Sequence, residues 1–490
     1  MPSPTPPISQ LVDTFNIAAS RVPAYKRILA ESGIGPEDIK TIDDFERLPI
    51  LDKYKTFQRF SLSDLHLDGK IGPVGEILPS SGASGVFSFG LYSPSQAQAH
   101  RNRLDEAFDA IFQVSTRKSL LLNCMPMGVK LHSKLCTLAE TSVRADMACA
   151  LVDALGDQHD QILLIGETAF IKHVLETGID SGIDWRKHLV HLIIGGEMVA
   201  ENARKYFESI LSTAPADIEK GLIGCSMGAA ELGLNLFADV PPIRPIILLR
   251  RALHENRSLA GELLGPDATT APALFSYDPA RAYVEFVDGR MVVTMLDPNR
   301  PIPMIRYAPG DYGFFLELPE RVRPWLDAMG VDTGVLDQLP VIAIWGRGQF
   351  AKSGSEGGRV YPEQIKEGIY HNGGLARLAT ANFRLSSGDD RARVRIQLVP
   401  GVDPSERIRQ AFAEAISCYV TWPLEVSCQR YEAFGSGMSL DYEVKFEYIS
   451  TDDQVQSSSL SGAYVPVTEA GTRDAVSHRD PGNVRPTQRL

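Results

Sequence analysis

The spacing of hydrophobic residues along the chain changes twice, and each change predicts a different kind of structure. Over residues 8–60, apolar residues such as Leu11 and Phe15 recur at helical spacing, and Gly33 ends the second predicted helix. From Glu76 onward, short apolar runs alternate with amphipathic stretches, which is the pattern of buried parallel strands separated by helices. The predicted strands include residues 119–123, 161–165 and 189–194, and the predicted helices include 168–177 and 203–211.

A more β-rich pattern follows, and then a compact α+β pattern. Residues 283–287 and 291–295 alternate as strands, and Asp288-Gly289-Arg290 between them is a hairpin signal. Residues 346–358 are rich in Gly and Ser, which predicts a linker or hinge. Beyond it we expect two strands separated by residues 387–390, a helix over 404–419 and a final strand over 441–448.

These patterns predict an α/β fold with two domains. The large N-terminal domain covers residues 1–346 and combines parallel sheets with a β-rich subdomain. A hinge leads to a small α+β C-terminal domain over residues 347–451. Residues 452–490 are polar and lack periodicity, so we expect a disordered tail.

Composition narrows the class of protein. The chain has 490 residues and a net charge of −12, which argues against nonspecific binding to nucleic acid or to an anionic membrane. Its six cysteines are scattered without a CxxC pair, as in proteins of a reducing cytosol. No signal peptide or membrane-spanning run is evident, so a cytoplasmic location is expected. The oligomeric state stays open, with a homodimer among the options.

One loop stands out for its chemistry. It precedes an apolar run and consists of small residues whose backbone N–H groups are free to form an anion-binding concavity. It lacks the Gly-Lys-Ser/Thr ending of a Walker loop. Taken alone it also fits a flexible surface loop. The candidate phosphate-binding residues are Ser80, Ser81, Gly82, Ala83, Ser84 and Gly85.

Two motifs in the middle of the chain place glycines or a carboxylate beside small residues. Gly195, Gly196 and Glu197 follow a predicted strand directly, where glycines let a flat ring approach the backbone. Further along, Glu231 can hold a hydrated magnesium ion against polyphosphate oxygens. The alternatives are an ordinary strand-to-helix turn for the first motif and a capping or surface acid for Glu231. The residues around Glu231 include Met227, Gly228 and Ala230.

Two further motifs involve Asp311 and Arg347. Asp311 follows a glycine turn, where its carboxylate can accept hydrogen bonds from two ribose hydroxyls. Arg347 lies between glycines and can reach a nucleotide and change position when a hinge rotates. A solvated turn aspartate and an exposed linker arginine are the alternatives.

The order of these five motifs resembles that of the adenylate-forming superfamily, which includes acyl-CoA synthetases, adenylation domains and luciferases. The chain looks most like the phenylacetate-CoA ligase-like branch, because residues 22–25, 41–53 and 301–307 are similar to that branch. The resemblance covers roughly residues 10–450.

The resemblance implies an ATP-dependent, Mg²⁺-assisted ligase. A substrate carboxylate would attack the α-phosphorus of ATP, releasing pyrophosphate, and the acyl group would then pass to a thiol. By motif matching, Ser80 to Gly85 would hold the β- and γ-phosphates and Gly195 to Glu197 would flank the adenine. Glu231 would serve magnesium, and Asp311 with Arg347 would hold the ribose.

Departures from the family pattern accompany the matches. Val86 stands where the loop usually has a lysine, Met227 where an aromatic is common and Ala230 where a threonine is usual. The best candidate for the adenylation lysine of the C-terminal domain is Lys445, for which a solvated strand lysine is the alternative. The acyl pocket is expected near two short segments, with core packing as the alternative. Its candidate residues are Cys124, Met127, Gly128, Cys225 and Ser226.

The leading hypothesis is therefore acyl transfer to coenzyme A. Direct transfer to an amine or to a carrier protein, in specialised biosynthesis, is the first alternative. A nucleotide-binding homologue without ligase turnover is the second.

Overall fold

The structure is a computed structural model. It describes residues 7–80, 85–126, 128–239, 244–266, 268–338, 340–354, 358–434, 442 and 446–449.

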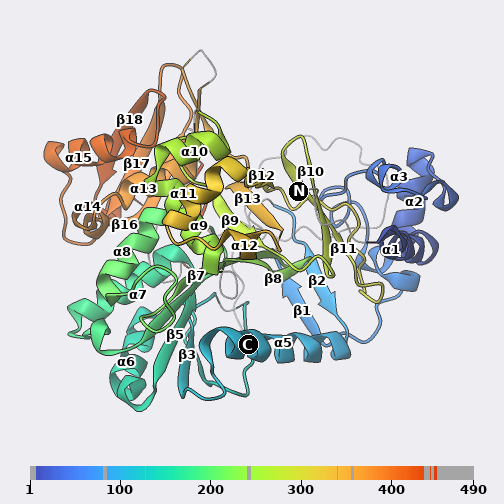
Figure 1. The fold of residues 1–490 in the computed structure, drawn as a ribbon, viewed down its shortest axis with the longest axis horizontal. Coiled ribbons are helices and arrows are strands. Elements are labelled where there is room, and N and C mark those ends of the chain that lie inside the picture. The colour runs from blue at the N-terminus through green and yellow to red at the C-terminus, as the bar shows by residue number, and fades with distance from the viewer. Residues whose placement is uncertain are drawn as a thin grey trace, which may run out of the picture. The chain divides into compact units, whose positions relative to one another are not determined.

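The N-terminal segment is a set of short helices, as the periodicity predicted (Figure 1). Leu11 and Phe15 are buried on one face of the first helix. Pro23 begins the second helix, and Gly33 ends it in the left-handed conformation at φ 67°. The elements are α1 (Ile8–Arg21), α2 (Pro23–Ser32), η1 (Pro36–Asp38), α3 (Ile42–Glu46), α4 (Leu62–Leu65) and η2 (Leu67–Gly69).

The Ser/Gly loop joins the strands of a two-stranded antiparallel hairpin. The hairpin consists of β1 (Glu76–Pro79) and β2 (Phe89–Tyr92). The 19-residue helix α5 (Pro94–Phe112) follows, and Ser93 caps its N-terminus. Residues Ser81 to Ser84 of the loop lie outside the described residues.

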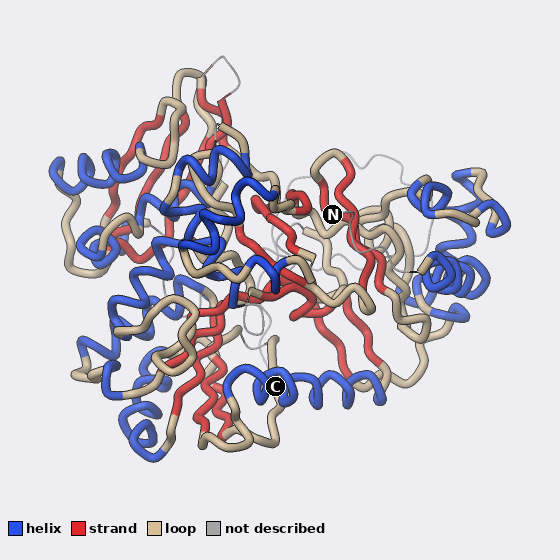
Figure 2. The backbone as a smooth tube through the Cα atoms, in the orientation of Figure 1, coloured by secondary structure: helices blue, strands red, loops and turns tan. Residues whose placement is uncertain are grey.

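An eleven-stranded mixed sheet forms the centre of the fold, drawn as red strands with helices on either side in Figure 2. Its order is β10-β11-β12-β13-β9-β8-β7-β6-β5-β3-β4. The strands from β4 to β7 run parallel, and those from β7 to β10 pair antiparallel. Strand β7 therefore pairs in parallel with β6 and antiparallel with β8.

The strands of this sheet confirm the predicted runs to within one or two residues. The strand bounds are β3 (Ser119–Asn123), β4 (Thr137–Glu140), β5 (Gln161–Gly166), β6 (Val190–Ile194), β7 (Ile223–Ala229), β8 (Gly233–Ala238), β9 (Ala273–Ser276), β10 (Ala282–Val287), β11 (Arg290–Met295), β12 (Tyr312–Phe315) and β13 (Val341–Gly346). The central strands β3 and β5 are buried along their whole length, because helices cover both faces of a parallel sheet.

Helices pack on this sheet through apolar faces. In α7, Phe170, Ile171 and Leu175 are buried at helical spacing. The helices of the large domain are α6 (Ala145–Leu155), η3 (Gly156–Gln158), α7 (Thr168–Asp180), η4 (Trp185–Lys187), α8 (Glu201–Leu211), α9 (Arg244–Glu255), α10 (Arg257–Leu264), η5 (Glu320–Val322), α11 (Arg323–Ala328) and α12 (Thr333–Leu336).

The C-terminal part is a three-stranded sheet with helices, as expected for an α+β domain. Strand β17 pairs antiparallel with β16 and parallel with β18. The elements are β14 (Ala351–Ser353), β15 (Gly358–Val360), α13 (Pro362–Ile369), α14 (Gly373–Leu378), β16 (Ala379–Ser386), β17 (Ala392–Leu398), α15 (Glu406–Ser417), β18 (Leu424–Gln429) and η6 (Tyr431–Ala433).

Two sequence predictions in this part differ from the structure. The linker expected over residues 346–358 contains strand β14, which pairs with β15 in a small hairpin. The strand expected over residues 441–448 is not formed at its described residues, 442 and 446–448. The Tyr448 carbonyl accepts a hydrogen bond from the Leu385 amide at 2.8 Å, and the next residue, Ile449, forms an isolated bridge with Leu385. Aromatic side chains produce the alternation there, because they pack on neighbouring elements. The tail over 452–490 lies outside the described residues, and the boundary at residue 346 stays a prediction.

Candidate active site

The carboxylate of Glu231 is the centre of the candidate site. Glu231 lies in the tight turn between β7 and β8, which is closed by a hydrogen bond from the Leu232 amide to the Ala229 carbonyl at 2.9 Å. Its side chain is buried, and its two oxygens accept from different segments. The Ser88 hydroxyl donates to Oε2 at 2.8 Å, and the Tyr307 hydroxyl donates to Oε1 at 2.7 Å.

Tyr307 is held in its neutral, donating form. Burial raises the pKa of the Tyr307 hydroxyl well above its ordinary range, and the Glu231 carboxylate raises it further. The turn itself is held from behind by Arg300, whose guanidinium donates to the Glu231 carbonyl at 2.5 Å and lies 5.2 Å from the Tyr92 ring. Glu231 is therefore a buried acceptor fixed by hydrogen bonds rather than a surface acid.

The base of the Ser/Gly loop is tied to this carboxylate. The Ser80 amide donates to the Ser88 carbonyl, and the Ser88 amide donates to the Ser80 hydroxyl, both at 2.9 Å. Gly90, on β2, approaches the Ala230 carbonyl so closely that a Cβ at this position would clash with it. The loop therefore begins and ends beside Glu231. Gly85 has φ 77° and open space around its Cα.

Lys53 is a cation in the neighbourhood of Glu231. The sequence motifs did not single it out. The Leu51 amide donates to the Arg306 carbonyl at 2.9 Å, and the Ala308 amide donates to the Leu51 carbonyl at 2.8 Å. This bridge carries the segment before Lys53 alongside Tyr307.

The charges that act on Lys53 include those of Glu231 and Arg347. Burial lowers the pKa of Lys53, and the nearby Arg347 cation lowers it further, while Glu231 and Asp52 oppose the shift. Two cations thus approach one buried carboxylate. The sequence signal for Lys53 is the run Leu48-Pro49-Ile50-Leu51-Asp52-Lys53, which lies within the N-terminal segment that resembles the family.

Asp311 and Arg347 lie beside the ends of two neighbouring strands. Asp311 directly precedes β12 and Arg347 directly follows β13. These strands are antiparallel neighbours, with Tyr312 opposite Gly346. The Asp311 backbone is fixed by a hydrogen bond from the Met291 amide at 2.9 Å.

The Gly195-Gly196-Glu197 motif follows β6 and contacts the C-terminal part of the chain. The Gly195 amide donates to the Gly166 carbonyl at 3.1 Å. Gly196 has φ 77°, and a Cβ there would clash with the Glu167 side chain. Glu197 Oε2 accepts from Lys366 Nζ at 2.7 Å and from the Tyr448 hydroxyl at 3.0 Å. Its carboxylate is therefore already paired.

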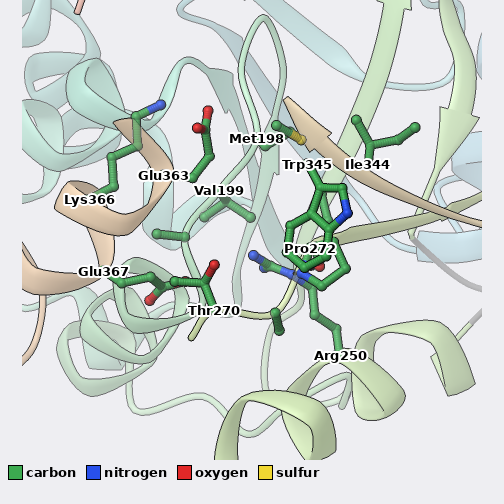
Figure 3. Close-up of a pocket in the computed structure, with 13 residues that line it drawn as sticks. Met198, Val199, Arg250, Thr270, Pro272, Ile344, Trp345, Glu363, Lys366 and Glu367 are labelled. Atoms are coloured by element: carbon green, nitrogen blue, oxygen red, sulfur yellow. Dashed lines mark hydrogen bonds between the residues drawn. The ribbon is translucent and has the colours of Figure 1, made fainter. Parts of the chain in front are cut away.

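A small cavity of about 20 Å³ lies behind this motif. Figure 3 shows Glu363, Lys366 and Glu367 of α13 on one side and Ile344 with Trp345 of β13 on the other. Burial opposes the charge on Lys366, but Glu197 and Glu363 raise its pKa above the ordinary value. The cavity has room for about one water molecule, so side chains fill this side of the motif.

The predicted acyl-pocket residues differ in how deeply they are buried. Cys124 is buried in the core beside Thr141, and burial raises its pKa to about 11. Cys225 is buried on β7, where burial raises its pKa to about 12. Ser226 is half-buried on the same strand, and Gly128 is exposed in a turn. Met127 lies outside the described residues.

Lys445 also lies outside the described residues, but its neighbours are anchored. The Tyr442 ring stacks on His173 with centroids 5.9 Å apart and packs edge-on against Phe170 at 5.2 Å. On the other side, the Tyr448 hydroxyl bonds Glu197. Both anchors contact the large domain near the candidate site.

Magnesium fits the described donor set. Within the described ranges, no group of three or more His, Cys, Asp or Glu side chains converges to form a cage. Glu231 with its hydroxyl partners suits an ion that keeps most of its waters and shares substrate phosphates. No helix within the described part of the chain is long and apolar enough to cross a membrane.

No family model and no curated protein matches this sequence. Solved structures do match the fold, at low sequence identity. One is a 2-hydroxyisobutyryl-CoA ligase in the postadenylation state with 2-HIB-AMP, with 15% identity, coverage of 91% of this chain and 89% of that chain, and a TM-score of 0.63. The same ligase in an open conformation with 2-HIB-AMP and CoA has 14% identity, coverage of 91% and 90%, and a TM-score of 0.51. The amide bond synthetase McbA from Marinactinospora thermotolerans has 13% identity, coverage of 87% and 80%, and a TM-score of 0.41.

Proposed function

We propose that this chain is an AMP-forming ligase that activates a carboxylic acid with ATP. The observation that carries the proposal is the convergence of four distant segments on Glu231. Ser88 and Tyr307 hold its carboxylate, while Lys53 and Arg347 bring positive charge to it. An adenylate-forming fold with a buried acid, two cations and a Ser/Gly loop at one point suits binding of a polyphosphate.

In the first step, an oxygen of the substrate carboxylate attacks the α-phosphorus of ATP and pyrophosphate leaves. Lys53 and Arg347 offset the negative charge of the phosphates, and backbone amides of the Ser/Gly loop bind their oxygens. Asp311 accepts hydrogen bonds from the ribose hydroxyls. Glu231 would hold Mg²⁺, which supplies charge neutralisation on the phosphates when it is bound.

Lys53 is a candidate for the cation that the Ser/Gly loop lacks at Val86. Val86 is a half-buried residue that packs against the core, so it provides no charge. Lys53 approaches Glu231 from the N-terminal segment. We propose that it provides the cation that Val86 cannot, and that Lys445 acts on the α-phosphate and carboxylate region.

In the second step, an acceptor attacks the acyl carbonyl and AMP leaves. We propose coenzyme A as the acceptor, in keeping with the phenylacetate-CoA ligase-like pattern of the sequence. The related 2-hydroxyisobutyryl-CoA ligase structure contains 2-HIB-AMP and CoA, which supports a thiol acceptor for this fold. Amines and carrier-protein thiols are the alternatives that a product analysis separates.

Carboxylate-dependent exchange of pyrophosphate into ATP tests the first step. A panel of aromatic, alicyclic, fatty and amino acids should contain at least one acid that supports exchange. Glu231→Gln should reduce that exchange about a hundredfold or more, because a neutral amide cannot replace a metal-binding carboxylate. Exposed Glu406→Gln serves as the matched control. Exchange that is unchanged in Glu231→Gln would contradict the assignment.

Mass detection of the product then identifies the acceptor. A thioester formed with coenzyme A supports the proposal. AMP released only when an amine is supplied, with an amide as product, would replace coenzyme A by an amine.

A further inference from the structure

A second cavity, much larger than the one beside Glu197, lies at the predicted hinge. Its volume is about 650 Å³, which is within the range of small-molecule sites. It is lined by residues before and after Gly348, including Tyr312 and Trp345 on one side and Phe350 and Tyr361 on the other. Glu231, Lys53, Asp311 and Arg347 are not among the described residues that line it.

Aromatic rings dominate the walls of this cavity. Phe350 and Tyr361 have ring centroids 5.8 Å apart at 56°. Tyr312 is 37% exposed even though its ring lies over Gly348, where a Cβ would approach it to 2.8 Å. Rings that are left partly uncovered around a cavity favour a flat apolar ligand that stacks between them.

Among the described residues that line the cavity, Arg359 is the one cation. The Arg359 guanidinium lies 4.7 Å from the centre of the Phe350 ring. Arg359 projects from β15 as an exposed residue, and no carboxylate among the described residues pairs with it. A guanidinium stacked on a ring keeps its edge free to bind a carboxylate in two hydrogen bonds.

Polar groups also line the cavity. The Gln364 side chain donates to the Thr269 hydroxyl at 2.9 Å, and both residues line the cavity. Burial raises the pKa of Glu363, another lining residue, so its carboxyl is less ready to repel an anion.

We propose that this hinge cavity binds a planar aromatic carboxylate at a site separate from the nucleotide site. The ring inserts among Tyr312, Phe350 and Tyr361, and the carboxylate pairs with Arg359. Because the walls come from both sides of Gly348, a bound ligand restrains the backbone of residues 346–354. Binding involves no covalent step.

Isothermal titration of the full chain with 2-naphthoate, in the absence of ATP, tests the site. We expect saturable binding that weakens about tenfold or more in Arg359→Met, because a charge-assisted contact is lost. Lys352→Met is the matched control: Lys352 is an exposed cation opposite Arg359 in the β14–β15 pair and does not line the cavity. The Lys352→Met variant should bind 2-naphthoate with the affinity of the wild-type chain.

Three further measurements test the site. Phe350→Leu should also weaken binding, and 2-naphthamide, which lacks the charge, should bind about tenfold more weakly than 2-naphthoate. Bound 2-naphthoate should slow hydrogen exchange in residues 346–354. No binding, equal affinity in Arg359→Met and Phe350→Leu, or equal affinity of the amide would overturn the proposal. Since ATP is absent, none of these outcomes depends on whether the chain forms adenylates.

Discussion

Lys366 and Glu197 form an ion pair with 2.7 Å between Nζ and Oε2, and both side chains are almost fully buried. Lys366 lies on α13, whereas Glu197 follows β6 in the motif predicted to flank adenine. The Lys366 ammonium also lies 4.3 Å from the Tyr448 ring. The pair therefore joins the C-terminal part of the chain to the large domain at the candidate site.

The neighbouring Glu367 strengthens this connection. Its carboxylate accepts hydrogen bonds from the backbone amides of Glu201 and Asn202, at 2.8 and 2.9 Å, at the start of α8. A carboxylate at a helix N-terminus satisfies free amides and complements the helix dipole. Two adjacent residues of α13 are thus bound to the large domain.

Lys366→Met should destabilise the protein by about 3–5 kcal/mol, because it leaves the Glu197 carboxylate buried without its partner. Urea unfolding measures the loss, and hydrogen exchange should localise it to residues 362–369. Lys352→Met, at an exposed lysine, is the control and should change stability by less than about 0.5 kcal/mol. Equal effects in the two variants would show that the pair contributes nothing specific.

Tyr307→Phe should lower pyrophosphate exchange about tenfold, because Glu231 loses one of its two hydroxyl donors. Ser88→Ala removes the other donor and should act similarly. The double variant should lose less than the product of the two single effects, since both donors act on the same carboxylate. Strictly multiplicative losses would mean that the two hydroxyls act independently of each other, which would contradict a shared action on one carboxylate.

Lys53→Met should raise the KM for ATP and lower exchange about tenfold or more, because a cation beside the phosphates is lost. The pH profile gives a sharper test. The pKa of Lys53 is lowered from 10.5, so in the wild type the alkaline loss of activity should begin below that value.

In Lys53→Arg the guanidinium stays charged, so the alkaline loss should move to higher pH while activity is partly retained. Lys55→Met, at an exposed lysine two residues along, is the control. An alkaline limb that is identical in the wild type and Lys53→Arg would assign the titration to another group.

Glu201→Gln should destabilise the protein by about 3–5 kcal/mol near neutral pH. Burial disfavours the Glu201 charge, but Arg204, Arg250 and Arg251 outweigh it and lower its pKa to about 2. A carboxyl with a lowered folded-state pKa contributes stability above its unfolded value of about 4.5, and that contribution disappears as pH falls toward 2.

The stability difference between the wild type and Glu201→Gln should therefore be constant from pH 7 to about 5 and should shrink between pH 4.5 and 2. Urea midpoints across this range provide the measurement. A difference that stays constant down to pH 2 would mean that the variant acts through packing alone.

Sequence periodicity predicted the parallel strands well, because β3 and β5 are buried on both faces and read as continuous apolar runs. The hairpin at Asp288-Gly289 was equally clear, since its turn needs φ above zero at both positions and the structure has φ 51° and 75°. At the described residues of 441–448 no strand forms: the Tyr442 ring packs on Phe170 of α7, and the Tyr448 hydroxyl donates to Glu197.

The candidate site was predictable only in part. Motif order indicated Glu231, Asp311 and Arg347, and the structure brings their backbone segments to a common region. Lys53 and Tyr307 could not be singled out, because their roles arise from the bridge between Leu51 and Tyr307, which joins residues far apart in the chain. No local pattern encodes such a pairing.

That bridge has a consequence for how such proteins diverge. If the segment ending at Lys53 supplies the cation of the phosphate site, the Ser/Gly loop does not need a lysine of its own. Residue 86 can then change during evolution, provided that the segment at Leu51 keeps its hydrogen bonds to residues 306–308. A search pattern keyed to a lysine inside the loop would pass over every chain that has made this exchange. One that pairs a lysine near residue 53 with a tyrosine near residue 307 would find them.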